Sequence, residues 1–323
     1  MPHVTFIHGI ANKPEKNILL RDWKDAFKDG DFNLAAKGVT TSMVYWADVV
    51  YPDPEEQAKA YESVGDGLGL ENDIPSLELG ASTTEHEIET MKSLALKFAA
   101  RNGDFRALLD EEFSEVNGDD EEVDKKVSDL EAFGLIPKPV RNRIMKRFLK
   151  DVHLYLFNKD YSPRPRETYR VRDHIRGLFV DQLKADAKLN AKRGGKHIVL
   201  SHSMGTVIAY DCLKNVPECP PIDSLFTVGS PLGISEVHDE LGPGYSKDNG
   251  FPSERVRQEW VNVCDRFDPV ALDAKLSNDY RLNGDKVIRD ISVSNSGRWR
   301  HSAWKYFGQN DLCSALAKSL EIL

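Results

Sequence analysis

Short apolar runs alternate along the chain with segments whose apolar residues recur at helical spacing. Residues 4–7 (VTFI) are apolar, partly β-branched and followed by His8-Gly9, which is typical of a strand buried on both faces of a parallel sheet. Similar runs predict further strands over 40–50, 197–200, 224–228, 260–264 and 287–293. Helical spacing predicts helices over 18–29, 168–193, 204–215 and 302–321. Strands separated by helices imply right-handed crossovers, so the pattern predicts an α/β fold with about six mostly parallel strands flanked by helices.

The composition changes abruptly at residues 51–54 (YPDP), which marks a boundary. Beyond it, up to residue 160, no convincing pair of strands is seen, but helical patterns occur over 54–64, 84–101, 104–115, 120–132 and 138–157. We therefore expect a core in two segments and a helical cap inserted after the second strand, with the core at 1–51 and 165–323 and the cap at 52–164.

Two segments of the predicted cap carry distinctive charge. The acidic run at 110–131 does not match the spacing of an EF-hand loop, so we interpret it as a solvated helical face rather than a calcium site. Residues 141–157 (RNRIMKRFLKDVHLYLF) form a basic amphipathic pattern. Such a helix can make transient contact with lipid, or it can bury its apolar side on the core, which is the commoner use. The net charge argues against constitutive binding to anionic lipid.

Composition excludes several classes of protein. The 323 residues are 40% hydrophobic, and 43 Lys and Arg against 52 Asp and Glu leave a net charge of −9, which makes nucleic acid an unexpected partner. No stretch approaches the ~20 apolar residues of a membrane span, and the first residues lack a basic leader segment, so we expect a cytoplasmic chain without membrane insertion. The four cysteines never form a CxxC pair, so the pattern suggests neither a zinc knuckle nor a disulfide framework.

The sharpest chemical signal lies at residues 198–206 (IVLSHSMGT), where a predicted strand runs directly into a predicted helix. The turn has the pattern small-x-Ser-x-Gly, which strand and helix need in order to approach closely. It would lift the hydroxyl of Ser203 to the carboxyl edge of the sheet, beside the helix N-terminus, where an anion is favoured. The plainer alternative is that Ser203 only caps the helix.

Four segments together resemble the α/β-hydrolase superfamily, in particular its lipase and esterase branch. Besides the serine turn, they are residues 6–10 (FIHGI), 226–233 (FTVGSPLG) and 261–270 (VNVCDRFDPV), and His301 follows the last strand. The resemblance covers the two core segments and says nothing about the cap. One departure is Ser201, which stands where the family has the first glycine of the turn.

The resemblance implies the minimal α/β-hydrolase fold and acyl transfer through a covalent acyl-enzyme, with no metal or organic cofactor. Ser203 would be the nucleophile, His301 its base and Asp268 the acid that orients the imidazole. Backbone NH groups of Met204 and of the loop after His8-Gly9, at Ile10, would form the oxyanion hole. The turn around the serine would be made by Ser201, His202 and Gly205.

Each of these roles has competitors. Asp265 and Asp268 both lie just beyond the strand predicted over 260–264, so either can be the acid, and the other carboxylate would then be a cap or an ion pair; we favour Asp268. Position after the last strand favours His301 over the other candidate bases, which are His153, His174 and His238. His8 and His202 adjoin the active-site loops, and we expect them to be packed and hydrogen-bonded rather than catalytic.

The predicted function is that of a serine carboxylesterase acting on a small-molecule ester with a short or medium acyl chain. The triad predicts the reaction class and not the substrate, because the same scaffold hosts thioesterases, amidases and acyltransferases. An acyltransferase or thioesterase using the same acyl-serine is the alternative among enzymes. A catalytically silent scaffold, with the cap as its working surface, is the alternative outside them.

Overall fold

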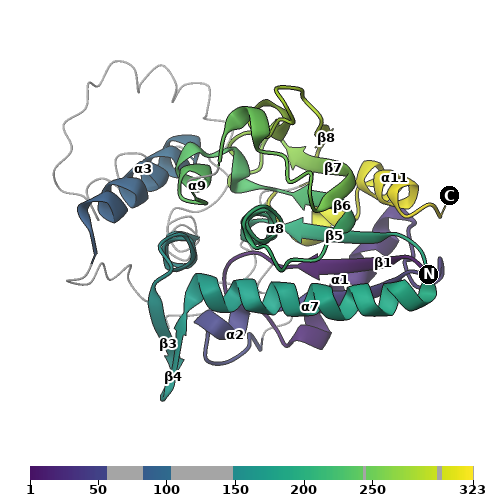
Figure 1. The fold of residues 1–323 in the computed structure, drawn as a ribbon, viewed down its shortest axis with the longest axis horizontal. Coiled ribbons are helices and arrows are strands. Elements are labelled where there is room, and N and C mark those ends of the chain that lie inside the picture. Colours follow the sequence, from purple (N-terminus) through teal and green to yellow (C-terminus); the bar gives the residue numbers. More distant parts are fainter. Residues whose placement is uncertain (57–82, 103–147, 243–244, 297–299, 323) are drawn as a thin grey trace.

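The computed structural model describes residues 1–56, 83–102, 148–242, 245–296 and 300–322, with side chains of the second range described through Phe98. Six parallel strands form one sheet in the order β2-β1-β5-β6-β7-β8 (Figure 1). The predicted parallel α/β architecture is therefore confirmed. The strands are β1 (His3–Ile7), β2 (Thr40–Val44), β5 (His197–His202), β6 (Ile222–Val228), β7 (Val256–Asp265) and β8 (Arg289–Val293).

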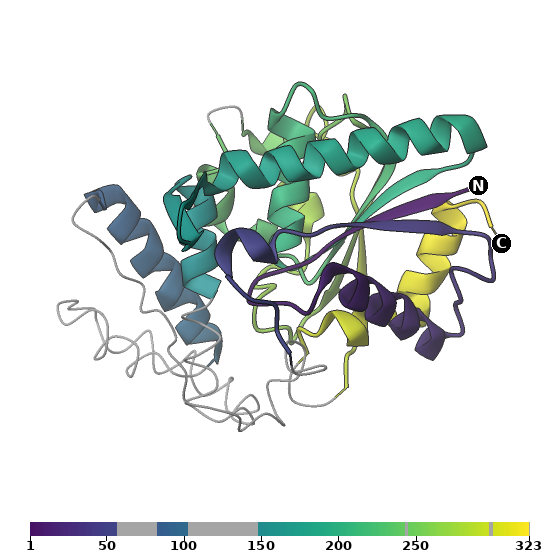
Figure 2. The ribbon, with the colours of Figure 1, turned by 90° about the horizontal axis from the view of Figure 1, so that it is seen from below.

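Helices cover both faces of the sheet, as Figure 2 shows. The long helix α7 (Val171–Arg193) and α8 (Met204–Asn215) lie on one face, and α1 (Lys16–Ala26) and α11 (Asn310–Ser319) lie on the other. Each face buries its own apolar cluster. Shorter elements are η1 (Phe27–Gly30), α2 (Ala47–Val50), η3 (Pro231–Gly233), α9 (Ser235–Asp239), η4 (Lys247–Asn249), η5 (Leu276–Asn278) and α10 (Ala303–Phe307).

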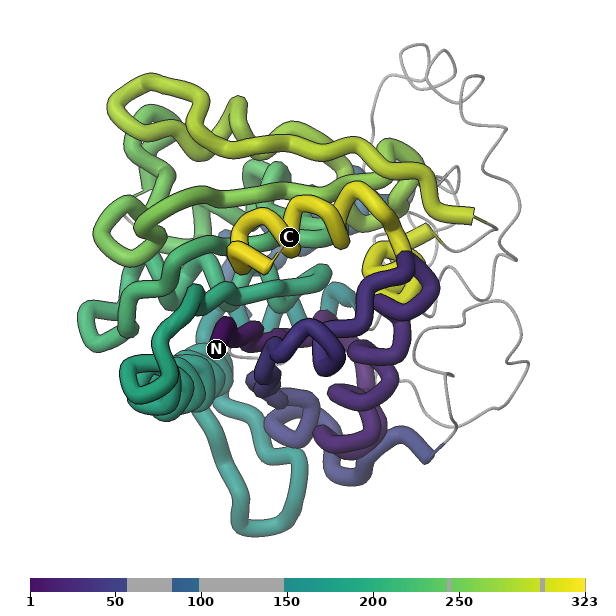
Figure 3. The backbone as a smooth tube through the Cα atoms, turned by 90° about the vertical axis from the view of Figure 1, so that its right-hand side faces the viewer, coloured from purple at the N-terminus to yellow at the C-terminus, as the bar shows by residue number. Residues whose placement is uncertain are grey.

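The two apolar clusters follow from the alternation of side chains along the strands. Phe6 points into the cluster under α1, with Trp23 and Phe307. Its neighbour Ile7 points to the opposite face, into the cluster that contains Phe179 of α7. A sheet covered on both sides explains why its strands read as nearly continuous apolar runs. Both chain ends lie on the same side of the molecule (Figure 3).

Several predicted boundaries are wrong. The strand predicted over 40–50 ends at Val44, because the backbone and indole NH groups of Trp46 both bond to His8 and turn the chain into α2. The helix predicted from residue 168 begins at Val171. The residues before it form an antiparallel hairpin of β3 (Asp160–Arg164) and β4 (Glu167–Arg170).

The predicted last helix is also wrong as a single element. It consists of α10 and α11, separated at Gly308, where the chain passes close to η1 and to the end of α1. A Cβ at residue 308 would lie 3.3 Å from the Cβ of Asp29. The break turns α11 so that Leu312 and Leu316 reach the cluster under the sheet.

The described part of the predicted cap packs against the core. Helix α3 (Glu85–Asn102) occupies one predicted helix, and residues 148–156 are helical within another. Their apolar side chains, such as Leu94 and Phe148, belong to the same buried cluster as the sheet. The described residues of the amphipathic segment thus bury their apolar side. The predicted helices over 104–115 and 120–132, most of that over 54–64, the start of that over 138–157 and the acidic run at 110–131 lie outside the described residues.

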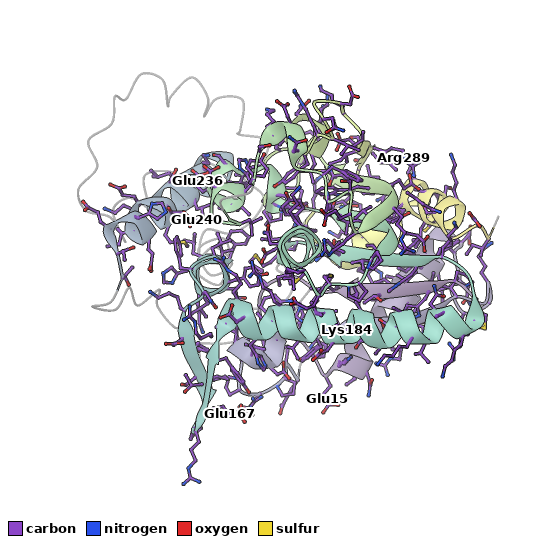
Figure 4. All side chains as sticks on the ribbon, in the orientation of Figure 1. Glu15, Glu167, Lys184, Glu236, Glu240 and Arg289 are labelled. Atoms are coloured by element: carbon purple, nitrogen blue, oxygen red, sulfur yellow. The ribbon has the colours of Figure 1, made fainter. Side chains whose placement is uncertain are left out.

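Polar side chains connect α3 with α9, which follows β6. Lys97 pairs with Glu236 at 2.6 Å, and Nε2 of His86 lies 2.5 Å from the carboxylate of Glu240, just after α9. Figure 4 labels the two glutamates, where α9 lies beside α3. Such exposed contacts add little stability. Among the described helices, none has the length and apolar character needed to cross a membrane.

Candidate active site

Ser203 sits in a strained turn between β5 and α8. Its backbone has φ +56° and ψ −131°, a conformation that residues other than glycine rarely adopt. Its own NH is held by the carbonyl of Val228 on the neighbouring strand at 3.0 Å. The sheet register therefore maintains the strain and places the serine side chain at the carboxyl edge, as the sequence pattern predicts.

Two glycines allow the first loop to approach this turn. A Cβ at residue 205 would lie 2.6 Å from the carbonyl oxygen of His8, and a Cβ at residue 9 would lie 2.5 Å from the Cβ of Ser203. Both distances are too short for any side chain. Ser201 is tolerated at its position because its hydroxyl donates to the carbonyl of Phe226 at 2.7 Å, within the sheet.

The three predicted reacting side chains form one hydrogen-bonded chain. The hydroxyl of Ser203 lies 2.8 Å from Nε2 of His301, and Nδ1 of His301 lies 2.8 Å from both carboxylate oxygens of Asp268. All three are buried, with exposed fractions of 1%, 5% and 0% respectively. The carboxylate accepts a hydrogen bond from the Nδ1–H group of His301. The other ring nitrogen, Nε2, therefore presents its lone pair to the serine hydroxyl.

The surroundings of Asp268 keep it ionised. Burial by itself raises the pKa of this carboxyl, but the charge and hydrogen bond of His301 and the hydroxyl of Tyr306 more than offset burial, so that its pKa lies below the ordinary value. Tyr306 donates at 2.7 Å, and the backbone NH groups of Val270 and Ala271 donate at 2.8 and 3.2 Å. The carboxylate thus keeps its charge at neutral pH and holds its orientation.

The competing carboxylate, Asp265, is occupied elsewhere. It accepts hydrogen bonds from the NH groups of Phe267 and Asn295, and it pairs with Arg300 at 3.1 Å. These contacts join the loop after β7 to the loop after β8. Asp265 therefore positions the segment that precedes His301, whereas Asp268 contacts the imidazole itself.

The competing histidines also have other partners. His153 lies 2.9 Å from Glu87, His238 lies 3.0 Å from Asp239, and His174 stacks on Tyr169. The structure brings none of the three within hydrogen-bond distance of Ser203.

His8 and His202 are packed and neutral. Nε2 of His8 accepts the NH of Trp46 at 3.0 Å, so its Nδ1 carries the proton and donates to the carbonyl of Gly9 at 2.8 Å. Burial, aided by the charge of Lys13, lowers the pKa of His8 to about 3. Burial likewise lowers the pKa of His202 well below its usual value, and its Nε2 donates to the carbonyl of His301 at 2.8 Å.

These two histidines predict a loss of stability in acid. The unfolded chain protonates them near pH 6.5, whereas the folded chain does so only at much lower pH, so the free energy of unfolding falls as the pH drops below 6.5. At pH 5 we expect His8 alone to remove about 2 kcal/mol. Urea unfolding at pH 7.5 and pH 5 measures this. H8Q should flatten the pH dependence.

The NH groups of Met204 and Ile10 are available to a ligand. Neither donates a hydrogen bond to any other residue that the structure describes. Met204 begins α8, whose N-terminus carries partial positive charge. The close approach of Gly9 to Ser203 brings the Ile10 loop to the serine. The two predicted donors thus belong to adjoining segments beside Ser203.

Gly229, within the 226–233 segment that the sequence analysis singles out, has φ +56° and leaves room for Asp268 and His301, because a Cβ there would lie 2.9 Å from Asp268. Two other residues beside the site are not marked by any pattern in the sequence. Tyr306 contacts Asp268 from α10. Asp151, from the helical segment at 148–156, is buried and accepts the NH of Ala11 at 2.8 Å.

Comparison of the whole chain with protein-family models and with curated proteins found no match.

Proposed function

We propose that this chain is a serine hydrolase of the α/β-hydrolase fold that cleaves small carboxylic esters. The observation that carries the proposal is the hydrogen-bonded chain from Ser203 through His301 to Asp268, at 2.8 Å for each link. Its support includes the parallel sheet, the strained turn at the nucleophile and two NH groups beside it.

The first half of the reaction acylates the enzyme. Oγ of Ser203 attacks the ester carbonyl carbon while its proton passes to Nε2 of His301. Asp268 stabilises the imidazolium that results. When the tetrahedral intermediate collapses, the C–O bond to the alcohol breaks, and the leaving alkoxide takes the proton from Nε2.

The second half restores the serine. Water attacks the acyl carbon and gives a proton to Nε2 of His301. When this second tetrahedral intermediate collapses, the bond to Oγ of Ser203 breaks, the carboxylic acid product leaves, and Oγ takes the proton back from Nε2. In both halves the NH groups of Met204 and Ile10 donate to the oxyanion, each contributing roughly 3 kcal/mol to lowering the barrier.

A fluorophosphonate probe tests the proposal directly, because it labels only a serine that is activated for attack. We expect stoichiometric labelling of the parent protein and none of S203A. A folded parent that does not label would favour the silent scaffold instead.

A series of p-nitrophenyl esters from acetate to palmitate then measures the acyl preference, which we expect to favour short and medium chains. Adding an alcohol or a CoA thioester distinguishes the alternatives. If the alcohol outcompetes water as the acyl acceptor, the chain is an acyltransferase using the same acyl-serine. If the CoA thioester outcompetes simple esters as the substrate, it is a thioesterase.

Asp151 is expected to position the loop of Ile10 and Ala11, whose Ile10 NH is a proposed oxyanion donor. Its carboxylate holds the NH of Ala11, whose φ of +68° is unfavourable for alanine, and it also accepts the hydroxyl of Tyr51 at 3.0 Å. Because losing one oxyanion donor costs about 10²- to 10³-fold, we expect D151A to lower kcat by about 10- to 100-fold. D151N keeps an acceptor for the NH and should retain most activity. Equal activity of D151A and the parent would remove this role.

A further inference from the structure

A second cluster of ionisable side chains lies at the opposite edge of the sheet from Ser203. His3 and His197 are paired in register on β1 and β5, so their side chains leave the same face of the sheet. Asp186 of α7 points between them from the covering helix. Their exposed fractions are 5%, 4% and 2%. The proposed reaction uses none of the three.

The atoms that face one another are all capable of binding a metal ion. Nε2 of His3 lies 3.4 Å from Oδ2 of Asp186, and the three ligand atoms lie within 4.8 Å of one another. Ligands at about 2.0–2.2 Å from a tetrahedral zinc ion are roughly 3.3–3.6 Å apart. The His3–Asp186 separation therefore already matches one edge of such a site.

Hydroxyl groups surround the three ligands. Thr5 lies 2.8 Å from Oδ2 of Asp186 and 2.9 Å from Nε2 of His197, and Ser42 lies 2.6 Å from the same Oδ2. The far nitrogen of His3, Nδ1, bonds to Thr40 at 2.8 Å and so fixes the imidazole ring. The cluster thus has a candidate fourth ligand in the Thr5 hydroxyl and a partner that orients one histidine.

We propose that His3, Asp186 and His197 form a structural site for a divalent transition metal ion of the zinc type. Two imidazole nitrogens favour zinc and its neighbours over magnesium and calcium, which prefer oxygen ligands. The ion joins β1, β5 and α7 at the amino ends of the strands. Ser203 lies six positions after His197, about 20 Å along the strand, so the ion takes no part in the acyl transfer.

Metal titration of the chelator-treated protein tests the site. We expect one Zn²⁺ per chain by calorimetry, and one Co²⁺ per chain with visible absorption bands of a low-coordinate nitrogen and oxygen site. D186N and H197Q should weaken Zn²⁺ binding by at least 10-fold. H174Q is the matched control, since His174 also belongs to α7 but stacks on Tyr169 away from the cluster, and it should bind like the parent.

The parent protein alone also decides the matter if the variants do not fold. Zn²⁺ should raise its unfolding temperature, and the rise should disappear when chelator is added. Absence of stoichiometric binding, or binding that D186N and H197Q leave unchanged, would overturn the proposal and leave a hydrogen-bonded polar cluster. Fluorophosphonate labelling is independent of these readouts, so failure of the metal site and failure of the esterase proposal are separate results.

Discussion

S203A is expected to lower kcat for ester hydrolysis by about 10⁶-fold, because the members of a triad act as a unit and the remaining groups have no nucleophile to activate. The substitution removes one side-chain hydrogen bond, from the Ser203 hydroxyl to Nε2 of His301. The positive φ at this residue is as accessible to alanine as to serine. We therefore expect the urea unfolding midpoint of S203A to stay close to that of the parent.

The matched control is S201A, two residues earlier in β5. Its hydroxyl is also buried, but it bonds to the carbonyl of Phe226 and contacts neither His301 nor Asp268. We expect S201A to lose about 1 kcal/mol of stability and to keep its activity. Steady-state hydrolysis of a p-nitrophenyl ester compares the two. Similar activity in S203A and the parent would remove Ser203 as nucleophile.

D268N is expected to reduce kcat by about 10³- to 10⁴-fold, because an amide in place of the carboxylate favours the wrong imidazole tautomer at His301. The amide also lacks the charge that stabilises the imidazolium. The effect should appear in kcat and kcat/KM alike, since the lost interaction strengthens in the transition state. Stopped-flow or steady-state kinetics of ester hydrolysis at pH 8 measures the decrease in kcat.

D265N is the comparison, at a carboxylate only three residues away. It loses charge against Arg300 but keeps an oxygen for the NH of Phe267, so we expect a decrease in kcat of less than about 10-fold. The opposite ranking of the two variants would transfer the role of the acid to Asp265. Equal small effects would mean that neither carboxylate orients His301.

The buried strands and the turn at Ser203 could be predicted because their structure depends on residues that are close together in the sequence. A buried parallel strand needs apolar residues on both faces, so β1, β5 and β6 were visible as runs. The turn at Ser203 is likewise local, because its small residues serve contacts within a few positions of the serine. The placement of Asp268 and His301 after successive strands came from the resemblance to a family.

The parts that could not be predicted depend on contacts between distant residues. Nothing near Asp151 indicates that it will reach Ala11, 140 positions earlier. The hairpin before α7 has mostly exposed side chains and two prolines, so no apolar alternation marks it. The His3 cluster exists only once the register of β1 against β5 is known, and register is set by the whole sheet.

The position of β1 inside the sheet bears on how the chain folds as it is synthesised. β1 pairs with β2 on one side, but its other partner is β5, where His3 meets His197, 194 positions later. A ribosome adds about 5–20 residues per second, so about 10–40 s pass before that edge can be covered. A two-stranded pair is barely stable in water. During this interval the apolar β1 segment lacks its β5 partner, so we expect slower translation between β2 and β5 to increase aggregation of the nascent chain.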